Sequence, residues 1–290
     1  MVSALAREAR MTPAQKALWF IESHLGEELT LEQIASVGGV SRFHMVRAFG
    51  AAFGLPVMRY VRARRLTQAA RSLADGAPDI LSVALAAGYA SHEAFTRAFR
   101  EQLGLTPEAL RERCNLDNLE LMEPLPMTAA PAASITPVRM EIATPLLLVG
   151  LSERHTQGDT TGISGQWSRF QPHLGSIPGQ VGDVAYGVCY NSDDAGNMDY
   201  LSGVEVADFS DVPPGLSRLR IPEQRYAVFR HADHISAIQR TWAGIFNDWL
   251  PGSEYMLADA PSFERYGPEF DPYTGEGGLE VWIPVEPQRR

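Results

Sequence analysis

The stretch SHEAFTRAFREQLGLTP, which runs from Ser91 to Pro107, repeats a stretch that lies 50 residues earlier in the chain. The earlier copy, SRFHMVRAFGAAFGLP, begins at Ser41 and ends at Pro56. The copies share an arginine, a phenylalanine and a glycine at one constant offset: Arg47 and Arg97, Phe49 and Phe99, Gly54 and Gly104. A repeat of this kind indicates that one structural unit occurs twice.

Each copy is predicted to be the second helix of a helix-turn-helix motif. Upstream of the first copy, Thr30 and Gln33 form a capping-box pattern that predicts a short helix ending at two glycines, and Ser41 then caps the next helix. The second copy follows the same order of cap, short helix, glycine turn and cap. Its corresponding residues are Asp79, Gly88 and Ser91.

The segment between the copies, PVMRYVRARRLTQAARSLADG, predicts one long helix with an apolar stripe. About 18 helical residues span ~27 Å at ~1.5 Å per residue. That length approaches the ~34 Å of one DNA turn, which separates two helices that read successive major grooves. Arginines occupy much of the remaining surface of this helix: Arg59, Arg62, Arg64, Arg65 and Arg71.

The charge is divided unevenly along the chain. The net charge is −10, but residues 1–117 hold 14 basic and 12 acidic residues, and residues 118–290 hold 11 basic and 23 acidic ones. Of the 14 basic residues in the first part, 13 are arginine, which suits contacts with phosphate and guanine. The division indicates two modules with different partners.

Length and composition suit a soluble chain of two domains. The proline-rich stretch before Pro137 reads as a linker, which gives a helical domain over 1–117, a linker over 118–136 and a second domain over 137–290. No apolar run approaches the ~20 residues that span a bilayer, and the N-terminus lacks the apolar region of a signal peptide. The two cysteines lack metal-ligand spacing, so we expect a reduced cytoplasmic protein without cofactor or metal.

Residues about 12–113 resemble the DNA-binding domain of AraC/XylS-type transcription regulators. The segment ALAAGYASHEAFTRAFREQLGLTPEALR carries the signature of that family. The resemblance implies an all-α domain of seven helices whose recognition helices begin after Ser41 and Ser91. Gly50 departs from the pattern, because the family usually has Lys or Arg there. The exposed, groove-facing positions that it implies are Arg42, Phe43, Val46 and Arg47 in the first copy and His92, Glu93 and Arg97 in the second.

From Pro137 the pattern changes to short apolar runs broken by Gly and Pro. The order of predicted elements is strand, helix, strand, strand, and this order occurs twice. The first unit begins with VRMEIATPLLLVGLSERH and the second with QRYAVFRHA. Two such βαββ units predict an α+β domain with helices on one side of a sheet and a concave groove along the pseudo-twofold seam.

This half resembles the GyrI-like small-molecule-binding domain, a duplicated βαββ fold of the SHS2 type, over about residues 137–287. The segments that carry the resemblance are YAVFRHADHISAIQRTWAGIFNDWLPGSEYMLADAPSFERY and LEVWIPV. A helix-turn-helix domain first and a GyrI-like domain second is the Rob-type arrangement. The resemblance therefore implies a multidomain regulator that binds double-stranded DNA and a small effector, with RNA polymerase as a candidate partner and no membrane association.

The candidate ligand site rests on Glu280, which shares one strand face with Trp282 by alternation. A carboxylate beside aromatic rings suits a cation or a hydrogen-bond donor. The resemblance matches Glu280 to the acidic residue of GyrI-like pockets and adds an aromatic residue from the first helix. The full set of candidates is Trp167, Tyr186, Tyr190, Glu280 and Trp282, with Glu205 as a weaker one.

Three functions remain open on the sequence alone. The first is a transcription regulator that responds to a lipophilic or cationic effector of the multidrug type. The second is a hydrolase of reactive small molecules, in which Glu280 with Trp167 or a tyrosine positions water. The third is a drug-sequestering module. His231 and His234 in HADH straddle a strand end without a nearby cysteine and predict no metal site. The attached DNA-binding domain favours the first function over catalysis.

Overall fold

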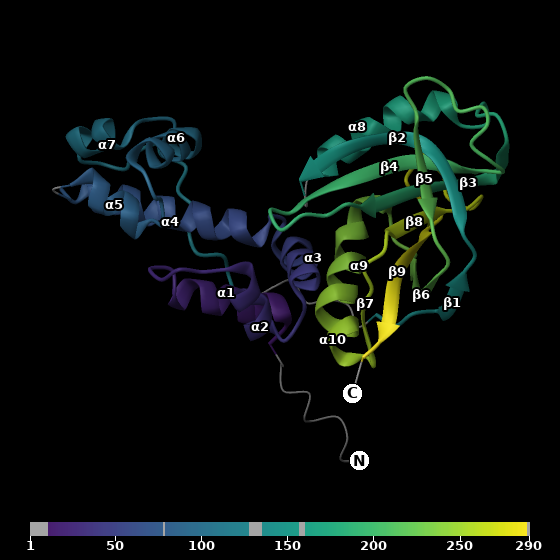
Figure 1. Cartoon of the computed structure of the whole chain (residues 1–290), viewed down its shortest axis with the longest axis horizontal. Coiled ribbons are helices and arrows are strands. Elements are labelled where there is room, and N and C mark those ends of the chain that lie inside the picture. Colours follow the sequence, from purple (N-terminus) through teal and green to yellow (C-terminus); the bar gives the residue numbers. More distant parts are fainter. Residues whose placement is uncertain (1–10, 78, 128–134, 157–159, 289–290) are drawn as a thin grey trace, which may run out of the picture.

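The computed structural model describes residues 11–77, 79–127, 135–156 and 160–288. It places a helical domain beside a domain built on one curled antiparallel sheet (Figure 1). Residues 1–10 of the predicted helical domain and residues 128–134 of the predicted linker lie outside the described residues. The helices of the first domain are α1 (Pro13–Ser23), α2 (Leu31–Gly38), α3 (Arg42–Phe53), α4 (Val57–Ala74), α5 (Ile80–Ala86), α6 (His92–Leu103) and α7 (Pro107–Arg113).

The caps predicted from the sequence begin these helices. The Thr30 hydroxyl accepts a hydrogen bond from the backbone N–H of Gln33, and the backbone N–H of Thr30 donates to the Gln33 side chain, which completes the capping box of α2. Ser41 and Ser91 accept from the backbone of the third helical residue of α3 and α6. Each capped hydroxyl satisfies one of the backbone N–H groups that a helix start leaves unpaired. The two helix-turn-helix motifs, α2–α3 and α5–α6, are therefore confirmed.

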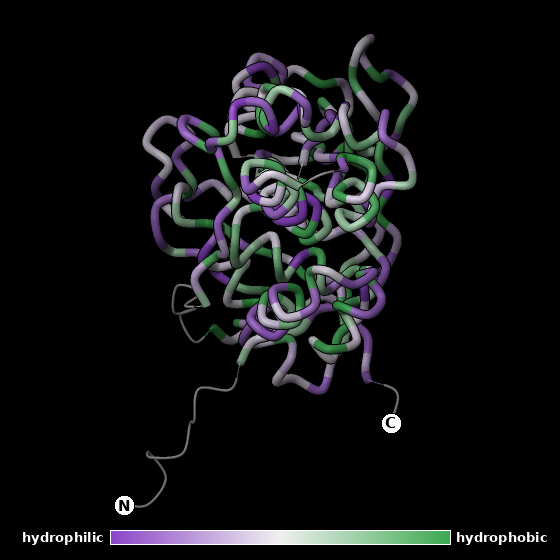
Figure 2. Tube along the Cα trace, turned by 90° about the vertical axis from the view of Figure 1, so that its left-hand side faces the viewer, coloured by the Kyte–Doolittle hydropathy of each residue, from purple (hydrophilic) through white to green (hydrophobic). Residues whose placement is uncertain are grey.

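Two apolar cores hold the helical domain together, and α4 contributes to both. The first core packs α1, α2 and α3 against the N-terminal half of α4 around Phe49 and Tyr60. The second packs α5, α6 and α7 against its C-terminal half around Phe95 and Phe99. Hydrophobic and hydrophilic residues follow one another along the chain (Figure 2), and α6 buries one face through Phe95, Phe99 and Leu103. The long α4 thus joins the two motifs at a fixed separation.

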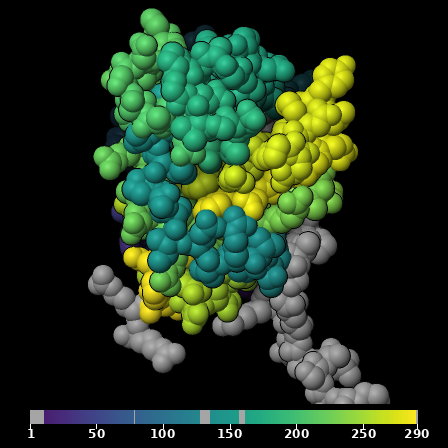
Figure 3. Space-filling model, turned by 90° about the vertical axis from the view of Figure 1, so that its right-hand side faces the viewer, coloured from purple at the N-terminus to yellow at the C-terminus, as the bar shows by residue number. Residues whose placement is uncertain are grey.

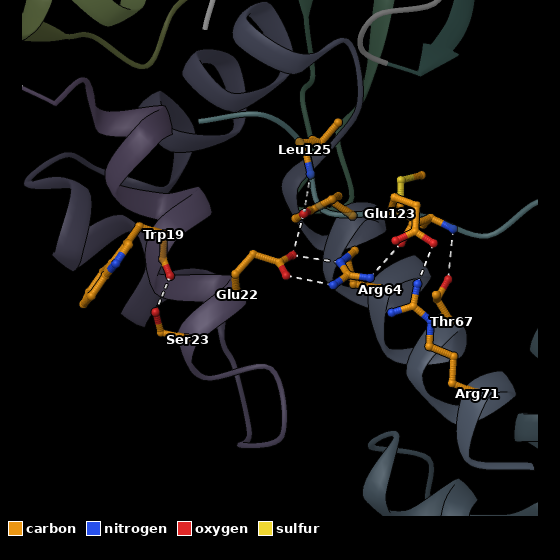
Figure 4. Close-up of polar contacts among 10 residues, drawn as sticks. Trp19, Glu22, Ser23, Arg64, Thr67, Arg71, Glu123 and Leu125 are labelled. Atoms are coloured by element: carbon orange, nitrogen blue, oxygen red, sulfur yellow. Dashed lines mark hydrogen bonds and ion pairs between the residues drawn. The ribbon is translucent and has the colours of Figure 1, made fainter. Parts of the chain in front are cut away.

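A polar cluster joins α1, α4 and the segment after α7 (Figure 4). Glu22 accepts from Arg64 Nε and Nη2, each at 2.8 Å, and from the hydroxyl of Tyr60 at 2.5 Å. The backbone N–H groups of Met122 and Leu125 donate to the side chains of Thr67 and Tyr60, at 2.9 and 3.2 Å. Arg64 is therefore buried, not on the surface as the arginine stripe predicted, because it neutralises Glu22 inside the domain.

The second domain contains the two βαββ units that the sequence predicted. The sheet has the order β1-β6-β9-β8-β3-β4-β2-β5, and β7 pairs with β9. The first unit supplies β2, α8, β3 and β4, the second β6, α9, β8 and β9, and β3 pairs with β8 at the seam. The strands are β1 (Arg139–Ala143), β2 (Leu146–Thr156), β3 (Gln180–Tyr190), β4 (Asn197–Val206), β5 (Ser217–Ile221), β6 (Gln224–His231), β7 (Tyr255–Leu257), β8 (Ser262–Tyr266) and β9 (Leu279–Pro287).

The single strand predicted for residues 138–155 is two strands, because the chain breaks at Pro145. The first part, β1, pairs with β6 of the second unit, whereas β2 pairs with β4 and β5. The sequence pattern did not predict β5 or β7. The first helix of the sheet domain, α8 (Thr160–Phe170), continues into a 3₁₀ turn (Gln171–His173). The second, α9 (Ile238–Gly244), continues into a π-helical turn (Ile245–Trp249) and α10 (Leu250–Gly252).

The two faces of the sheet have different roles. One face packs against α8, α9 and the π-helical turn through residues such as Val281 and Ile283. The other face lies inside the curl, where Tyr226, Phe263 and Trp282 form a separate core. Figure 3 shows a hollow in the molecule where atoms of the last strands lie between earlier parts of the same domain. Because side chains alternate along a strand, neighbouring residues of β8 and β9 belong to different faces.

The two domains meet through α3. His44 Nε2 donates to the carbonyl of Phe246 at 2.7 Å, and the Asn247 side chain donates to the carbonyl of Ala48 at 3.0 Å. Ala48 belongs to the same apolar core as Trp242 and Phe246 of the sheet domain. The first helix-turn-helix motif is therefore docked against the second domain, and α5, α6 and α7 lie away from it (Figure 1).

Candidate functional site

A pocket of about 340 Å³ lies between the sheet, its two helices and α3. The strands β4 and β8 supply Tyr200 and Glu264, α8 supplies Trp167, and α9 supplies Trp242. Arg47 comes from α3, so the helical domain contributes one wall. A volume of this size and an aromatic lining with few polar groups are typical of small-molecule sites.

Glu264 is the carboxylate of this pocket and is 7% exposed. Its Oε2 accepts from the hydroxyl of Tyr266 at 2.7 Å and from that of Tyr200 at 3.1 Å. Its Oε1 accepts from Trp242 Nε1 at 3.0 Å. Three neutral donors thus satisfy the oxygens of a buried carboxyl group, and none of these contacts is an ion pair.

The tyrosines that face Glu264 remain protonated. Burial, and after it the charge of Glu264, raises the pKa of Tyr200 and of Tyr266 well above the ordinary value. Burial also raises the pKa of the Cys189 thiol in the same pocket. The hydroxyls are therefore hydrogen-bond donors throughout the physiological pH range.

Gly187 leaves the space in which this hydrogen-bond network forms. A Cβ atom at this position would lie 2.0 Å from the Tyr200 hydroxyl and 3.0 Å from Glu264 Oε2. Gly187 pairs with Glu264 across β3 and β8, at the seam between the two units. A side chain here would push Tyr200 away from the carboxylate.

Of the predicted ligand residues, Trp167 lines this pocket and donates from Nε1 to the Tyr200 hydroxyl at 3.1 Å. Glu280 and Trp282 lie on the other face of the sheet. Arg139 donates to Glu280 from Nη1 at 2.5 Å and from Nη2 at 3.1 Å, and the Arg139 guanidinium lies 5.1 Å from the Trp282 ring centroid. The ion pair with Arg139 holds the pKa of Glu280 below its usual value although burial opposes this.

The two predicted tyrosines also face the inside of the curl. Tyr186 packs on Phe263 and donates to the weaker candidate Glu205 at 3.4 Å. The Tyr190 hydroxyl bonds with that of Ser152 at 2.6 Å. The structure therefore does not bring Tyr186, Tyr190, Glu280 or Trp282 together with Trp167. The hydrolase hypothesis needs Glu280 close to Trp167 so that the two can position a water molecule. The two side chains lie on different faces of the sheet, so Trp167 does not take this role.

Sequence reasoning missed the pocket's carboxylate, its two tyrosines and the role of Trp242. The strand pattern of SFERY contained a signal, because alternation places Glu264 and Tyr266 on one face. That face points toward the helices only because β8 is central in the sheet, and a strand pattern does not give this placement. Trp242 packs in the core of the sheet domain and also lines the pocket.

The two recognition helices differ in exposure. On α6, Glu93 and Arg97 are exposed, and His92 pairs with Glu108 at 3.0 Å. On α3, only Arg42 remains exposed, where it pairs with Glu32 and Asp194, and Phe43 is half-buried.

The predicted exposure of Val46 and Arg47 was wrong. Val46 is 3% exposed because it packs into the core of the helical domain. Arg47 is 4% exposed because the sheet domain covers it, with Nη1 at 4.0 Å from Met198 Sδ.

Comparisons with known proteins agree with this architecture. Residues 136–286 match the model of the GyrI-like small molecule binding domain, and residues 34–113 match that of a helix-turn-helix domain. The chain belongs to the GyrI-like family. It is 25% identical to the transcriptional regulator Rob of Salmonella typhimurium over 92% of this chain and 96% of Rob.

The N-terminal domain has relatives of its own. The chain is 32% identical to the HTH-type transcriptional activator AarP of Providencia stuartii, over 37% of this chain and 80% of AarP. The HTH-type transcriptional regulator YbfP of Bacillus subtilis and the right origin-binding protein of Escherichia coli match over about a third of their own length. The chain is thus a DNA-binding transcription regulator of the AraC type with a small-molecule-binding domain.

Among solved structures, SAV2435 bound to tetraphenylphosphonium is 22% identical, with a TM-score of 0.44 over 51% of this chain and 93% of that one. The DNA-binding domain of AdpA in complex with a target DNA is 28% identical, with a TM-score of 0.34 over 35% of this chain and 92% of that one. No helix among the residues that the structure describes is long and apolar enough to cross a membrane.

Proposed function

We propose that this regulator binds lipophilic cations in the pocket around Glu264 and reads DNA with α3 and α6. The effector site is the one between the sheet and its helices, not the Glu280 surface that the sequence favoured. The protein acts in the cytoplasm, contacts RNA polymerase at its promoters, and uses its second domain to sense ligands and not to catalyse a reaction. The observation that supports the ligand class is the buried Glu264 carboxylate among aromatic side chains.

The chemistry of the pocket favours a positive ligand. A carboxylate that is removed from water attracts a cation more strongly than an exposed one does, because the surrounding dielectric constant is low. The rings of Trp167, Trp242 and Tyr266 add apolar contact area and negative ring faces. A neutral ligand would gain the apolar contacts alone.

The arrangement of the helical domain supports the DNA part of the proposal. Two capped recognition helices are joined by α4, whose 18 residues span ~27 Å. Glu93 and Arg97 are exposed on α6 and have the chemistry to contact cytosine and guanine or phosphate. Since the two helices differ in sequence, we expect a monomer to bind an asymmetric site of two half-sites.

The test is calorimetric titration of the full chain with tetraphenylphosphonium and with a neutral aromatic ligand of similar size. Glu264→Gln should weaken binding of the cation by roughly 10- to 150-fold, since a hydrogen bond or contact to a charge contributes about 1.5–3 kcal/mol. It should change binding of the neutral ligand much less, because the aromatic walls remain.

Glu280→Gln is the matched control. It removes the same charge from the other face of the sheet, where Glu280 pairs with Arg139, and should leave both affinities unchanged. Equal cation affinity in wild type and Glu264→Gln would remove Glu264 from the site. If only Glu280→Gln lost affinity for the cation, the ligand site would be the one that the sequence predicted around Glu280.

A further inference from the structure

We infer that α3 is held against the ligand pocket as an internal inhibitor of DNA reading, and that a cation bound at Glu264 releases it. This inference rests on the proposed function, because it concerns the regulation of the same pocket. It assigns to Arg47 a role as the residue that links the pocket to the first recognition helix.

The docked face of α3 is the face that DNA would need. Every residue from His44 to Gly50 is buried, and the sheet domain covers Arg47. A major groove admits an α-helix only when one long face of the helix is free. In this arrangement the first helix-turn-helix motif cannot enter a groove, whereas α6 is free to do so.

The docking is specific and uses polar groups from both domains. The carbonyls of Phe246 and Ala48 accept from His44 and Asn247, and these bonds are buried. The hairpin between β3 and β4 adds a close contact, since a Cβ atom on Gly196 would lie 2.3 Å from Cβ of Pro56. Two separate parts of the sheet domain therefore hold α3 in one position.

Arg47 connects this docking to the pocket. Its guanidinium lines the same pocket as Glu264, Cys189 and Met198 and lies 5.4 Å from the ring centroid of Phe43. A cationic ligand that enters the pocket becomes a second positive charge beside a guanidinium that is 4% exposed. Like charges that share one low-dielectric pocket repel each other, and undocking of α3 relieves the repulsion.

The repulsion also determines which effectors shift α3 from the docked to the undocked state. A cation occupies Glu264 and opposes Arg47, so it favours the undocked state. An anion would be attracted to Arg47 and would favour the docked state. By linkage, a ligand shifts the equilibrium only by the difference between its affinities for the two states.

The experiment is selection of binding sites from a random duplex library by the full chain, without ligand and with saturating tetraphenylphosphonium. Without ligand, the wild type should enrich one block of bases, which α6 reads. With the cation, it should enrich two blocks whose centres are about 10 base pairs apart, the distance between successive major grooves.

A variant tests the docking without any ligand. Asn247→Asp places a carboxylate against the Ala48 carbonyl in place of the amide donor, so it should undock α3 and enrich both blocks. Asn118→Asp makes the same chemical change at an exposed site and should behave as wild type.

Two results would overturn the docking, and a third would overturn the release by ligand. One is enrichment of both blocks by the ligand-free wild type, and the other is a single block for Asn247→Asp. A single block for the wild type with the cation bound, as verified by calorimetry, would overturn the release by ligand. Failure of the cation to bind at all would instead contradict the proposed ligand class, and the Asn247→Asp selection would still decide whether docking hides α3.

Discussion

His44 makes the docking of α3 sensitive to pH. Burial lowers its pKa to about 4, although the bond to the Phe246 carbonyl opposes this shift. When α3 undocks and His44 reaches water, its pKa returns to the ordinary value of about 6.5. The docked state therefore binds fewer protons than the undocked state between these two values, and docking is at full strength only above about pH 6.5.

We expect the domains to separate as the pH falls from 7 to 5. Docking should weaken by about 1.4 kcal/mol per pH unit between about pH 6.5 and pH 4 and should not change further below that. Small-angle X-ray scattering should detect an increase in the radius of gyration. His44→Gln keeps a donor for the Phe246 carbonyl but does not titrate, so its radius should not rise over this range.

A rise of equal size in His44→Gln would assign the pH effect to other groups. The charged residues on the elements that meet here are Arg42 and Arg47 on α3, Arg240 on α9, Asp248 on the π-helical turn, Glu264 on β8, and Asp193, Asp194 and Asp199 on the β3–β4 hairpin and β4. His44 is the group that we expect to dominate, because it is buried in the interface and bonds directly to the sheet domain.

Pocket residues were harder to predict from the sequence than helix ends. The alternation in LEVWIPV placed Glu280 and Trp282 together, and they do lie together, with Trp282 Nε1 donating to Glu280 at 3.1 Å. What alternation cannot give is the face on which the helices pack, because this depends on pairing between distant strands. Glu264 was therefore not predicted as a ligand residue, although it lies in a strand that the sequence predicted.

At the scale of elements, the local signals were sufficient for the helical domain. The caps Thr30, Ser41, Asp79 and Ser91 begin α2, α3, α5 and α6 where the sequence placed them. An N-cap side chain bonds to a backbone N–H group only three residues further on, so it can be recognised in the sequence without knowledge of the rest of the fold. The short strands β5 and β7 lacked such a signal, since each is fixed by its partner strand.

The exposure of α6 leads to a prediction for the ligand-free protein. Arg97→Ala should weaken binding to the selected duplex by ~1–3 kcal/mol and relax base preference at one position if Arg97 reads a base. If Arg97 contacts only phosphate, the loss should be uniform across sequences and the salt dependence should decrease. Fluorescence anisotropy titrations at several salt concentrations measure both quantities.

Arg225→Ala provides the control for this prediction. It removes an exposed arginine from β6 of the sheet domain and should leave DNA affinity unchanged. Unchanged binding of Arg97→Ala to both selected and random duplexes would exclude Arg97 from the DNA interface.

At the scale of the whole molecule, the chain combines an arginine-rich domain with an acidic one. The acidic domain covers α3 and leaves α6 free. Sequence analysis predicted both domains and their order but not this contact, because an interface between domains leaves no periodic pattern in either of them. The contact makes the ligand pocket and the first recognition helix parts of one site.

The measurement that tests this claim most directly is the distance between the domains with and without bound cation. Spin labels on cysteines at positions 19 and 273 would sit on exposed residues of the two domains, Trp19 in α1 and Tyr273 in the sheet domain. The background carries Cys114→Ser, because Cys114 is exposed whereas Cys189 is buried. Pulsed electron paramagnetic resonance then gives the distribution of distances.

The account predicts one narrow distribution without ligand and a longer, broader one at saturating tetraphenylphosphonium. Asn247→Asp should give the longer distribution without any ligand. An unchanged narrow distribution in the wild type, with calorimetry showing that the cation is bound, would contradict the claim that α3 leaves the pocket when the pocket is filled.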